Sequence, residues 1–499
     1  MLYQSTRGSG IRATDAEAIT KGLSEDGGLF VPERFPQISE RTIRSFAAKP
    51  YRNLAAYIMG LYFDCFSPEE LDRLTGVAYS EPNFDHPAIA PLHRLDSSTY
   101  FLELWHGPTS AFKDMALQVL PRLLTASLSK TGEKREVCVL VATSGDTGKA
   151  ALEGFCDARG TRIMVFYPVD GVSEIQKLQM TSQRGGNVNV VAVKGNFDDA
   201  QNGVKQIFSD AEVRRILDGQ GFFLSSANSI NVGRLIPQIA YYVSAYCDMQ
   251  NCGAIKDGEK INICVPTGNF GNILAAYYAE RMGLPVGKLI CASNSNDVLT
   301  QFINTGVYNR NRQFFTTASP SMDILISSNL ERLLYETSGK DGGAVSGYMS
   351  ELSSCGRYVV PPSVQEEIVR IFACGMCSEE DTLKTIADMY GKHNYLIDTH
   401  TAVAYKVLND YREKSGDNTP AVVVSTASPY KFCDSVLKAL GRPCGEGGAG
   451  LIDALAEATG SKIPAPLEAL KDKKPRFSGS VQTGGMRAAV LEFLGVAGS

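Results

Sequence analysis

Short, unbroken apolar runs alternate with helix-like segments through the middle of this chain. The runs are rich in β-branched residues and lead into turn residues: EVCVLVAT (136–143), RIMVFYP (162–168), VNVVAV (188–193), INICVP (261–266), KLICAS (288–293) and AVVVST (421–426). Strands that are apolar on both faces are typical of parallel sheets covered by helices on both sides. The sequence therefore predicts an α/β fold built on parallel sheets.

The two ends of the chain differ from this middle part. Residues 1–92 read as helical and mixed, and they close with the proline-rich EPNFDHPAIAPL (81–92), which indicates a linker. A chain of 499 residues is too long for one simple core, so two or three packed regions are expected. The glycine-rich GRPCGEGGAG (441–450) indicates a flexible connector at the start of a C-terminal extension, 441–499.

Charge and composition argue against several classes of protein. The net charge is −5 and no long basic run occurs, so nucleic acid is not expected as a partner. The sequence has no apolar run of about 18 residues, and MLYQSTRGSG at the start lacks the apolar core of a signal peptide. The 12 cysteines are scattered through apolar stretches, as reduced thiols in the cytoplasm are. Neither the single Cys-x-x-Cys, Cys374 with Cys377, nor the five histidines form a metal-binding pattern, so no metal site is expected.

Three loops follow predicted strands: TSGDTG, TGNFGN and TASPY. Parallel sheets bind ligands at the carboxyl ends of their strands, so these loops are the candidate ligand-binding segments. In TGNFGN (267–272), Gly268 and Gly271 allow the backbone to approach a ligand, and a helix-like segment follows. Such a loop forms a phosphate cradle, or equally a tight strand-to-helix turn, and the loop alone leaves both interpretations open.

TSGDTGK (143–149) superficially resembles a nucleotide-binding loop. The P-loop requires four residues between its glycines and a hydroxyl residue after the lysine, and this loop has neither feature. Ser144, Thr147 and the N–H groups of a helix start suit a carboxylate or a small anion, although the same residues also serve as helix caps. GEGGAG (445–450) formally matches the dinucleotide fingerprint, but no strand precedes it, so a linker is expected there.

Lys113 has an unusual setting in HGPTSAFKDMALQ (106–118), because it follows Phe112 and precedes a predicted helix. Burial beside apolar groups favours the neutral amine, which is nucleophilic and condenses with aldehydes. Together with a phosphate cradle, such a lysine indicates pyridoxal phosphate. A solvated surface lysine is the alternative, and composition alone does not exclude it.

Six motifs in order resemble those of the threonine synthase family, of the fungal and enterobacterial type. They are AITKGLSEDGGLFVP, HGPTSAFKD, ATSGDTGKAA, SANSINVGR (226–234), PTGNFGN and STASPYKF. The resemblance extends from about residue 3 to about residue 440. It implies a fold-type II pyridoxal-phosphate enzyme, with parallel sheets in a large and a small domain and a mostly helical N-terminal region, 1–92. The catalytic core would span 93–440, with a small mobile subdomain within about 115–240.

The resemblance also implies a role for each motif residue. Lys113 would bind the cofactor covalently and act as the catalytic base, with Asp146 near the ring and Thr426 facing its nitrogen. The cofactor phosphate would be bound by the loop Gly268, Asn269, Phe270, Gly271 and Asn272. Ser144, Gly145 and Thr147 would take the substrate carboxylate. The substrate phosphate would be held by Asn228, Ser229, Asn231 and Arg234, with Lys177 as a further candidate. Ser428 departs from the family pattern, in which many members carry histidine.

The implied reaction converts O-phospho-L-homoserine and water to L-threonine and phosphate. Two alternatives share most of these motifs. One is a related phospholyase, which would release phosphate, ammonia and a keto acid. The other is a non-catalytic relative, for which a lost lysine or phosphate loop would be expected, and both are intact here. The sequence does not distinguish a monomer from a homodimer.

Overall fold

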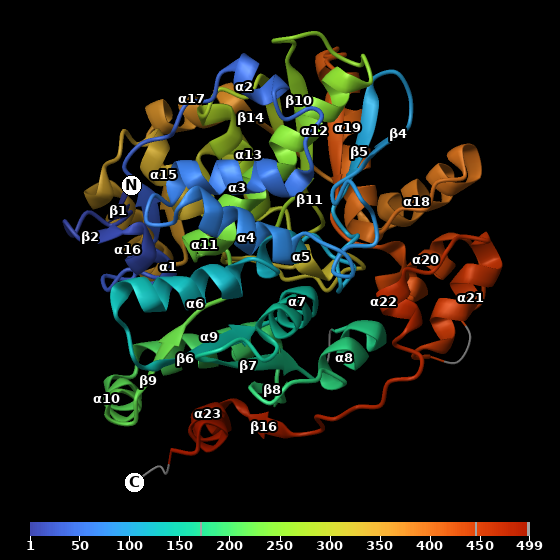
Figure 1. Cartoon of the computed structure of the whole chain (residues 1–499). Helices are drawn as coiled ribbons and strands as arrows, with labels where there is room; N and C mark the ends of the chain where they lie inside the picture. Colours follow the sequence, from blue (N-terminus) through green and yellow to red (C-terminus); the bar gives the residue numbers. More distant parts are fainter. Residues whose placement is uncertain (170–171, 445–446, 497–499) are drawn as a thin grey trace.

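A computed structural model describes residues 1–169, 172–444 and 447–496 (Figure 1). Gly445 and Glu446, which belong to the expected connector, lie outside the described residues. Within the described residues, no helix is both long enough and apolar enough to cross a membrane.

The larger sheet has six strands in the order β14-β11-β10-β15-β5-β4. Their bounds are Phe372–Met376 for β14, Val286–Ser293 for β11, Ile261–Pro266 for β10, Ala421–Ser425 for β15, Thr99–Glu103 for β5 and Leu92–Arg94 for β4. The first five strands run parallel, and the edge strand β4 pairs antiparallel with β5. Strands β10, β11 and β15 correspond to three of the predicted runs.

The smaller sheet is parallel throughout, in the order β16-β8-β7-β6-β9. Its strands are β16 Ser480–Gln482, β8 Val188–Lys194, β7 Thr161–Pro168, β6 Glu136–Ala142 and β9 Phe222–Ser225. The three remaining predicted runs form β6, β7 and β8. The parallel α/β fold expected from the sequence is therefore confirmed, as two separate sheets.

Strand β16 comes from the C-terminal extension, where the sequence predicted no strand. Figure 1 shows the red C-terminal segment running along the lower edge of the smaller sheet to α23, Met486–Leu494. Apolar residues of α23, including Met486, Val490 and Leu494, form one buried cluster with the sheet and with α9, Phe197–Ser209. A three-residue strand is too short to show a pattern in the sequence. Its partner strand also lies almost 300 residues away, so no local signal links the two.

The N-terminal region contains helices and a small antiparallel sheet, β2-β1-β3. Its elements are β1 Leu2–Ser5, β2 Arg12–Thr14, α1 Asp15–Lys21, β3 Phe30–Pro32, α2 Glu40–Arg44, α3 Tyr51–Tyr62 and α4 Pro68–Ala78. α1 begins at a capping box, in which Thr14 and Glu17 bond each other's backbone N–H groups. This region is mainly helical, as expected, and its apolar residues belong to the same buried cluster as both sheets.

The other helices pack around the two sheets and against one another. They are α5 Asp114–Leu117, α6 Leu120–Thr131, α7 Asp146–Phe155, α8 Glu174–Thr181, α10 Ala211–Gly219, α11 Val232–Leu235, α12 Ile239–Asn251, α13 Gly271–Arg281, α14 Val298–Thr305, α15 Leu330–Thr337, α16 Gly342–Ser354, α17 Pro362–Ile371, α18 Glu379–His393, α19 Thr399–Ser415, α20 Cys433–Ala439, α21 Gly450–Thr459 and α22 Ala465–Glu468. β12, Val307–Asn309, and β13, Arg357–Val359, form a two-stranded antiparallel ribbon, and four short 3-10 helices complete the described elements. Helices α12 and α13 are apolar on nearly every face because they are buried in the middle of the molecule.

The order of the strands brings the candidate loops together. β10, β15 and β5 are neighbours in the larger sheet and run in the same direction, so the loops at their carboxyl ends meet. These are the glycine loop 267–272, the loop that contains Thr426 and the loop that contains Lys113. The loop after β6 belongs to the other sheet, so the site lies where the two sheets face each other.

Candidate active site

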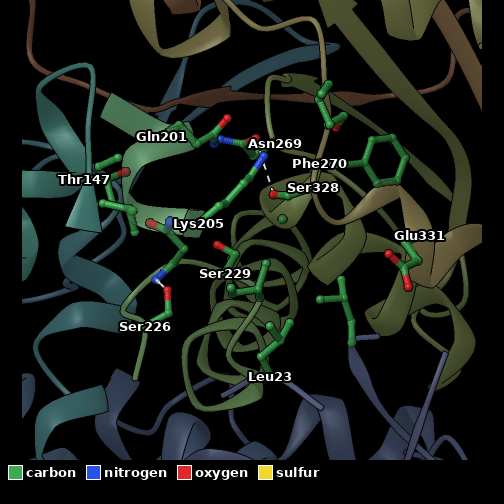
Figure 2. A pocket seen from close by; sticks show the side chains of 18 of the residues that line it. Leu23, Thr147, Gln201, Lys205, Ser226, Ser229, Asn269, Phe270, Ser328 and Glu331 are labelled. Carbon is green, nitrogen blue, oxygen red and sulfur yellow. Dashed lines mark hydrogen bonds between the residues drawn. The ribbon is translucent and has the colours of Figure 1, made fainter. Parts of the chain in front are cut away.

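A cavity of about 1030 Å³ lies between the two sheets and the N-terminal region. Its lining includes residues from all six of the quoted motifs and from α9. Figure 2 shows Thr147 on one side of this cavity and Phe270 and Glu331 on the other, with Asn269 and Ser328 between them. The volume is in the range of cavities that bind small molecules and cofactors.

Lys113 lies at the start of α5, and only 7% of its surface is exposed. The preceding loop is anchored to the larger sheet, since the Phe112 N–H donates to the carbonyl of Thr426 at 2.8 Å. Lys113 Nζ donates to Asp146 Oδ2 at 3.4 Å and to Ser321 Oγ at 3.2 Å. Burial lowers the pKa of Lys113 to about 8, with the Asp146 carboxylate opposing this shift and the Arg234 cation adding to it. The burial and nucleophilic character expected for this lysine thus agree with its surroundings.

Asp146 is the buried anion beside this lysine. Its Oδ1 lies 2.8 Å from Lys431 Nζ and accepts a hydrogen bond from Gln176 Nε2 at 2.7 Å. Burial alone would raise the pKa of Asp146, but the ammonium groups of Lys431 and Lys113 lower it well below its usual value. The carboxylate therefore stays ionised, and it serves as a fixed negative charge rather than as a proton carrier. Lys431 and Gln176 were not singled out by sequence reasoning.

Ser321 and His400 are two further lining residues that sequence reasoning missed. The Ser321 N–H donates to His400 Nε2 at 3.2 Å, and His400 Nδ1 lies 2.8 Å from Asp398 Oδ2. With Nε2 accepting and Nδ1 donating, this geometry fits the neutral imidazole. The segment around Ser321 has no strand-like or motif-like pattern, so only the tertiary structure brings it to Lys113.

The glycine loop leads from β10 into α13. A Cβ atom on Gly268 would lie 2.5 Å from the carbonyl oxygen of Ser321, and one on Gly271 would lie 2.6 Å from Cβ of Ser229. Phe270 is buried with a left-handed backbone, φ 62°, which is uncommon for a residue with a side chain. All five loop residues, Gly268, Asn269, Phe270, Gly271 and Asn272, line the cavity. Asn272 Nδ2 is buried and has no hydrogen-bond partner among the described residues, which leaves a donor for an anion.

A second candidate anion site lies around Arg234, in α11. Arg234 is 4% exposed and lines the cavity together with Asn228 and Ser229. Its Nη1 donates to the carbonyl of Ala227 at 2.7 Å, while its Nε is buried and has no partner among the described residues. Burial lowers the pKa of Arg234 to about 10, so the guanidinium remains charged at neutral pH. An uncompensated cation in this position favours a bound anion.

The remaining predicted residues fall into two groups. Ser144, Thr147 and Thr426 line the cavity, as the proposed contacts require. Gly145, Lys177 and Asn231 are not among its lining residues.

The structure shows how each of these three residues is placed. Lys177 is on the exposed face of α8. The side chain of Asn231 is used as the cap of α11, accepting from the Gly233 N–H at 2.8 Å and donating to the carbonyl of Ile19 at 2.9 Å. Gly145 is required by its backbone, φ 135°, and by contact with Gln176, because a Cβ atom would lie 2.5 Å from that side chain.

The residues around Lys113 and the glycine loop fit pyridoxal phosphate. Lys113 is buried with a pKa of about 8, which favours covalent attachment to an aldehyde. The cradle needs glycine at 268 and 271, and the unsatisfied amide of Asn272 suits a phosphate oxygen. Thr426 at the carboxyl end of β15 suits the ring nitrogen. The site therefore offers three separate groups that suit this cofactor.

Comparison with known proteins agrees with a pyridoxal-phosphate site. Family profiles match in order along the chain: threonine synthase N terminus over residues 2–79, pyridoxal-phosphate dependent enzyme over 82–428 and threonine synthase, C-terminal over 401–484. The fold and the site thus define a pyridoxal-phosphate-dependent enzyme, and the expected cofactor is confirmed.

Individual relatives identify the family within this class of enzyme. The threonine synthase of Pseudomonas aeruginosa is 39% identical over 448 residues, covering 88% of this chain and 90% of that protein. A solved structure of pyridoxal-phosphate-bound threonine synthase from Brucella melitensis superposes with a TM-score of 0.86, at 37% identity, covering 99% of both chains. The chain belongs to the threonine synthase family.

A related human protein has a different length. Threonine synthase-like 1 of Homo sapiens is 40% identical over 438 residues, which is 85% of this chain. The match covers only 58% of that protein, so this chain spans less than two thirds of it.

Proposed function

We propose that this protein is a threonine synthase, which converts O-phospho-L-homoserine and water to L-threonine and phosphate. The observation that carries the proposal is the buried guanidinium of Arg234, whose Nε has no partner among the described residues, in the same cavity as Lys113 and the glycine loop. The cavity then offers two separate anion sites, one for the cofactor phosphate and one for a phosphate on the substrate. A substrate without phosphate would leave Arg234 uncompensated.

Lys113 is the residue that moves protons in this proposal. Bound pyridoxal phosphate supplies an electron sink that acidifies the proton on Cα of the amino acid. Lys113 has a pKa of about 8, so its amine takes up and returns protons near neutral pH. Asp146 stays ionised between Lys113 and Lys431, so it holds the Lys113 ammonium in place after proton uptake. Ser321 Oγ, 3.2 Å from the same nitrogen, fixes the direction of the amine.

The two ends of the substrate are held by different parts of the fold. Ser144 and Thr147, at the start of α7, suit the carboxylate, and the helix end adds a favourable field. Arg234, Asn228 and Ser229 suit the phosphate, whose charge grows as the bond from Cγ to oxygen breaks. With both ends held in the cavity that Lys113 also lines, the substrate carbons would lie within reach of its amine.

The test is product identification with the purified holoenzyme and O-phospho-L-homoserine. We expect L-threonine and inorganic phosphate in equal amounts, and no threonine from Lys113→Ala. Phosphate with ammonia and a keto acid would identify the related phospholyase instead. No turnover of the substrate by an enzyme that binds the cofactor would overturn both reactions.

Two further assignments belong to this proposal. We place the protein in the cytoplasm, since all 12 cysteines are free thiols.

We divide the chain into an N-terminal region, 1–92, a catalytic core, 93–440, and an extension, 441–499. The smaller sheet, at about 115–240, would form the mobile subdomain. The pairing of β16 with β8 supports counting the end of the extension with that subdomain.

A further inference from the structure

Arg332, in α15, is completely buried, although it carries a guanidinium group. All four of its hydrogen bonds within the described chain go to neutral oxygen atoms. Burial lowers its pKa, with partial opposition from Tyr278 and Glu331. A buried charge without a direct carboxylate partner is costly, so its retention calls for a reason beyond packing.

Three of these bonds connect the N-terminal region with the second anion site. Arg332 Nε donates to the carbonyl of Phe30, in β3, at 2.9 Å. Nη1 donates to the carbonyl of Ser229 at 2.9 Å and Nη2 to that of Ile230 at 2.6 Å. The guanidinium thus holds the backbone of the segment that carries Asn228 and Ser229.

The fourth bond leads to the glycine loop. Arg332 Nη1 donates to Asn329 Oδ1 at 2.5 Å, and Asn329 donates to the carbonyl of Asn269 through its N–H at 3.1 Å and through Nδ2 at 2.9 Å. Ser327 Oγ donates in the same way to the carbonyl of Gly268 at 2.8 Å. In a trans peptide the N–H points opposite to the carbonyl, so holding these two carbonyls on one side directs the next two N–H groups to the other.

The two loops also touch each other directly. The position that a Cβ atom of Gly271 would occupy lies 2.6 Å from Cβ and 2.7 Å from Oγ of Ser229. Arg332 is bonded to Ser229 and, through Asn329, to Asn269, so its positive charge lies close behind both loops. In the protein interior such a charge is screened less than in water and favours anions at both places.

We propose that Arg332 is a positioning residue shared by two anion sites, the cofactor phosphate loop and the substrate phosphate segment. The second half of this assignment rests on the proposed function. Arg332 itself is not among the residues that line the cavity. It orients the backbone groups that do, and adds one positive charge behind them.

The experiment measures two affinities separately in each variant. The cofactor affinity of the apoenzyme is measured through the fluorescence of Trp105, the single tryptophan, whose Nε1 donates to Ser425 Oγ beside Thr426. The affinity of the holoenzyme for inorganic phosphate is measured by calorimetry at saturating cofactor, so that phosphate does not compete at the cofactor loop.

Each variant has its own expected signature. Arg332→Lys should weaken both affinities by about 10-fold or more, because a point charge cannot make the forked contacts. Arg234→Ala should weaken only phosphate binding, and Asn329→Ala mainly cofactor binding. Arg370→Lys is the matched control, since Arg370 pairs with Glu367 on the surface of α17, and it should change neither.

Two results for a folded Arg332→Lys protein would overturn the assignment. One is that both affinities are unchanged, and the other is that only one of the two affinities is weakened. If Arg332→Lys does not fold, Asn329→Ala decides, and an unchanged cofactor affinity in that variant refutes the link to the glycine loop. Threonine formation is scored independently. If the wild-type holoenzyme makes no threonine while Arg332→Lys weakens both affinities, the proposed reaction is refuted and the role of Arg332 at the two anion sites stands.

Discussion

Lys431 and Asp146 form a buried ion pair, with Lys431 Nζ 2.8 Å from Asp146 Oδ1 and both side chains almost inaccessible to solvent. Lys113 Nζ lies 3.4 Å from the other carboxylate oxygen. One anion therefore faces two cations, and the pKa of Lys113 depends on both neighbours. The carboxylate raises this pKa, and the Lys431 ammonium lowers it.

Substitution of these two neighbours should move the pKa of Lys113 in opposite directions. In the wild-type apoenzyme, the rate of covalent cofactor attachment should rise with pH around a midpoint of about 8, because the neutral amine reacts. Asp146→Asn should lower the midpoint, and Lys431→Met should raise it, each by about one unit or more. Attachment is followed by absorbance, with borohydride reduction and peptide mapping to Lys113. Shifts in the same direction would contradict this account of the charge balance.

Arg234→Ala should lower kcat/KM for O-phospho-L-homoserine by about 30- to 1000-fold, equivalent to about 2–4 kcal/mol for a lost charge-assisted contact. Arg234→Lys should recover only part, since it cannot reproduce the guanidinium fork. Cofactor affinity should hardly change, because the cofactor phosphate belongs to the glycine loop. Steady-state kinetics and cofactor titration of the same preparations test this. Loss of cofactor from a folded Arg234→Ala protein would show that the two phosphate sites are interchanged.

Lys177→Ala should leave kcat/KM within about twofold of the wild type, because an exposed side chain outside the cavity contributes little. Lys113→Ala, assayed in parallel, should abolish turnover. A 10-fold loss in Lys177→Ala would mean that the smaller sheet closes over the substrate and brings α8 to its phosphate.

Gly268→Ala should weaken cofactor binding by about 10-fold or more and lower stability by about 1–3 kcal/mol, since the new Cβ would lie 2.5 Å from the Ser321 carbonyl. Gly347→Ala in α16 is the control, because nothing lies within 4 Å of its Cβ position. Replacing glycine inside a helix there should stabilise the protein by up to about 1 kcal/mol. Cofactor titration and thermal melting of both variants give the comparison. Equal behaviour of the two would argue against a tight cradle.

His106 should make stability depend on pH. Burial alone would lower the pKa of His106, but its contacts with Asp85 at 2.7 Å and Glu103 at 2.9 Å raise it to about 9. A pKa above the ordinary value of 6.5 means that the stabilisation is complete below about pH 6.5 and lost as the pH rises through about 9. His106→Gln should therefore cost about 1–3 kcal/mol at pH 6 and much less at pH 10. Denaturant melts at both pH values measure this, and a loss independent of pH would refute the charged pair.

The sequence by itself determined the class of fold, and it predicted Lys113 as the cofactor lysine together with three candidate ligand-binding loops. Apolar runs of strand length mark buried parallel strands because both of their faces are covered, and the glycines of TGNFGN mark a backbone that must come close to its neighbours. These signals are local, so one continuous stretch of residues carries each of them.

The tertiary structure alone decided which other groups complete the site. Ser321, His400 and Arg332 contact residues far away in the sequence, and no local pattern distinguishes them from ordinary surface or core residues. Asn231 and Lys177 show the reverse case. Asn231 belongs to a quoted motif and Lys177 was a further candidate, yet the first is used as a helix cap and the second faces solvent. Whether a polar side chain faces a ligand depends on which hydrogen-bond partners the fold has already given it, and that is settled only when the chain has packed.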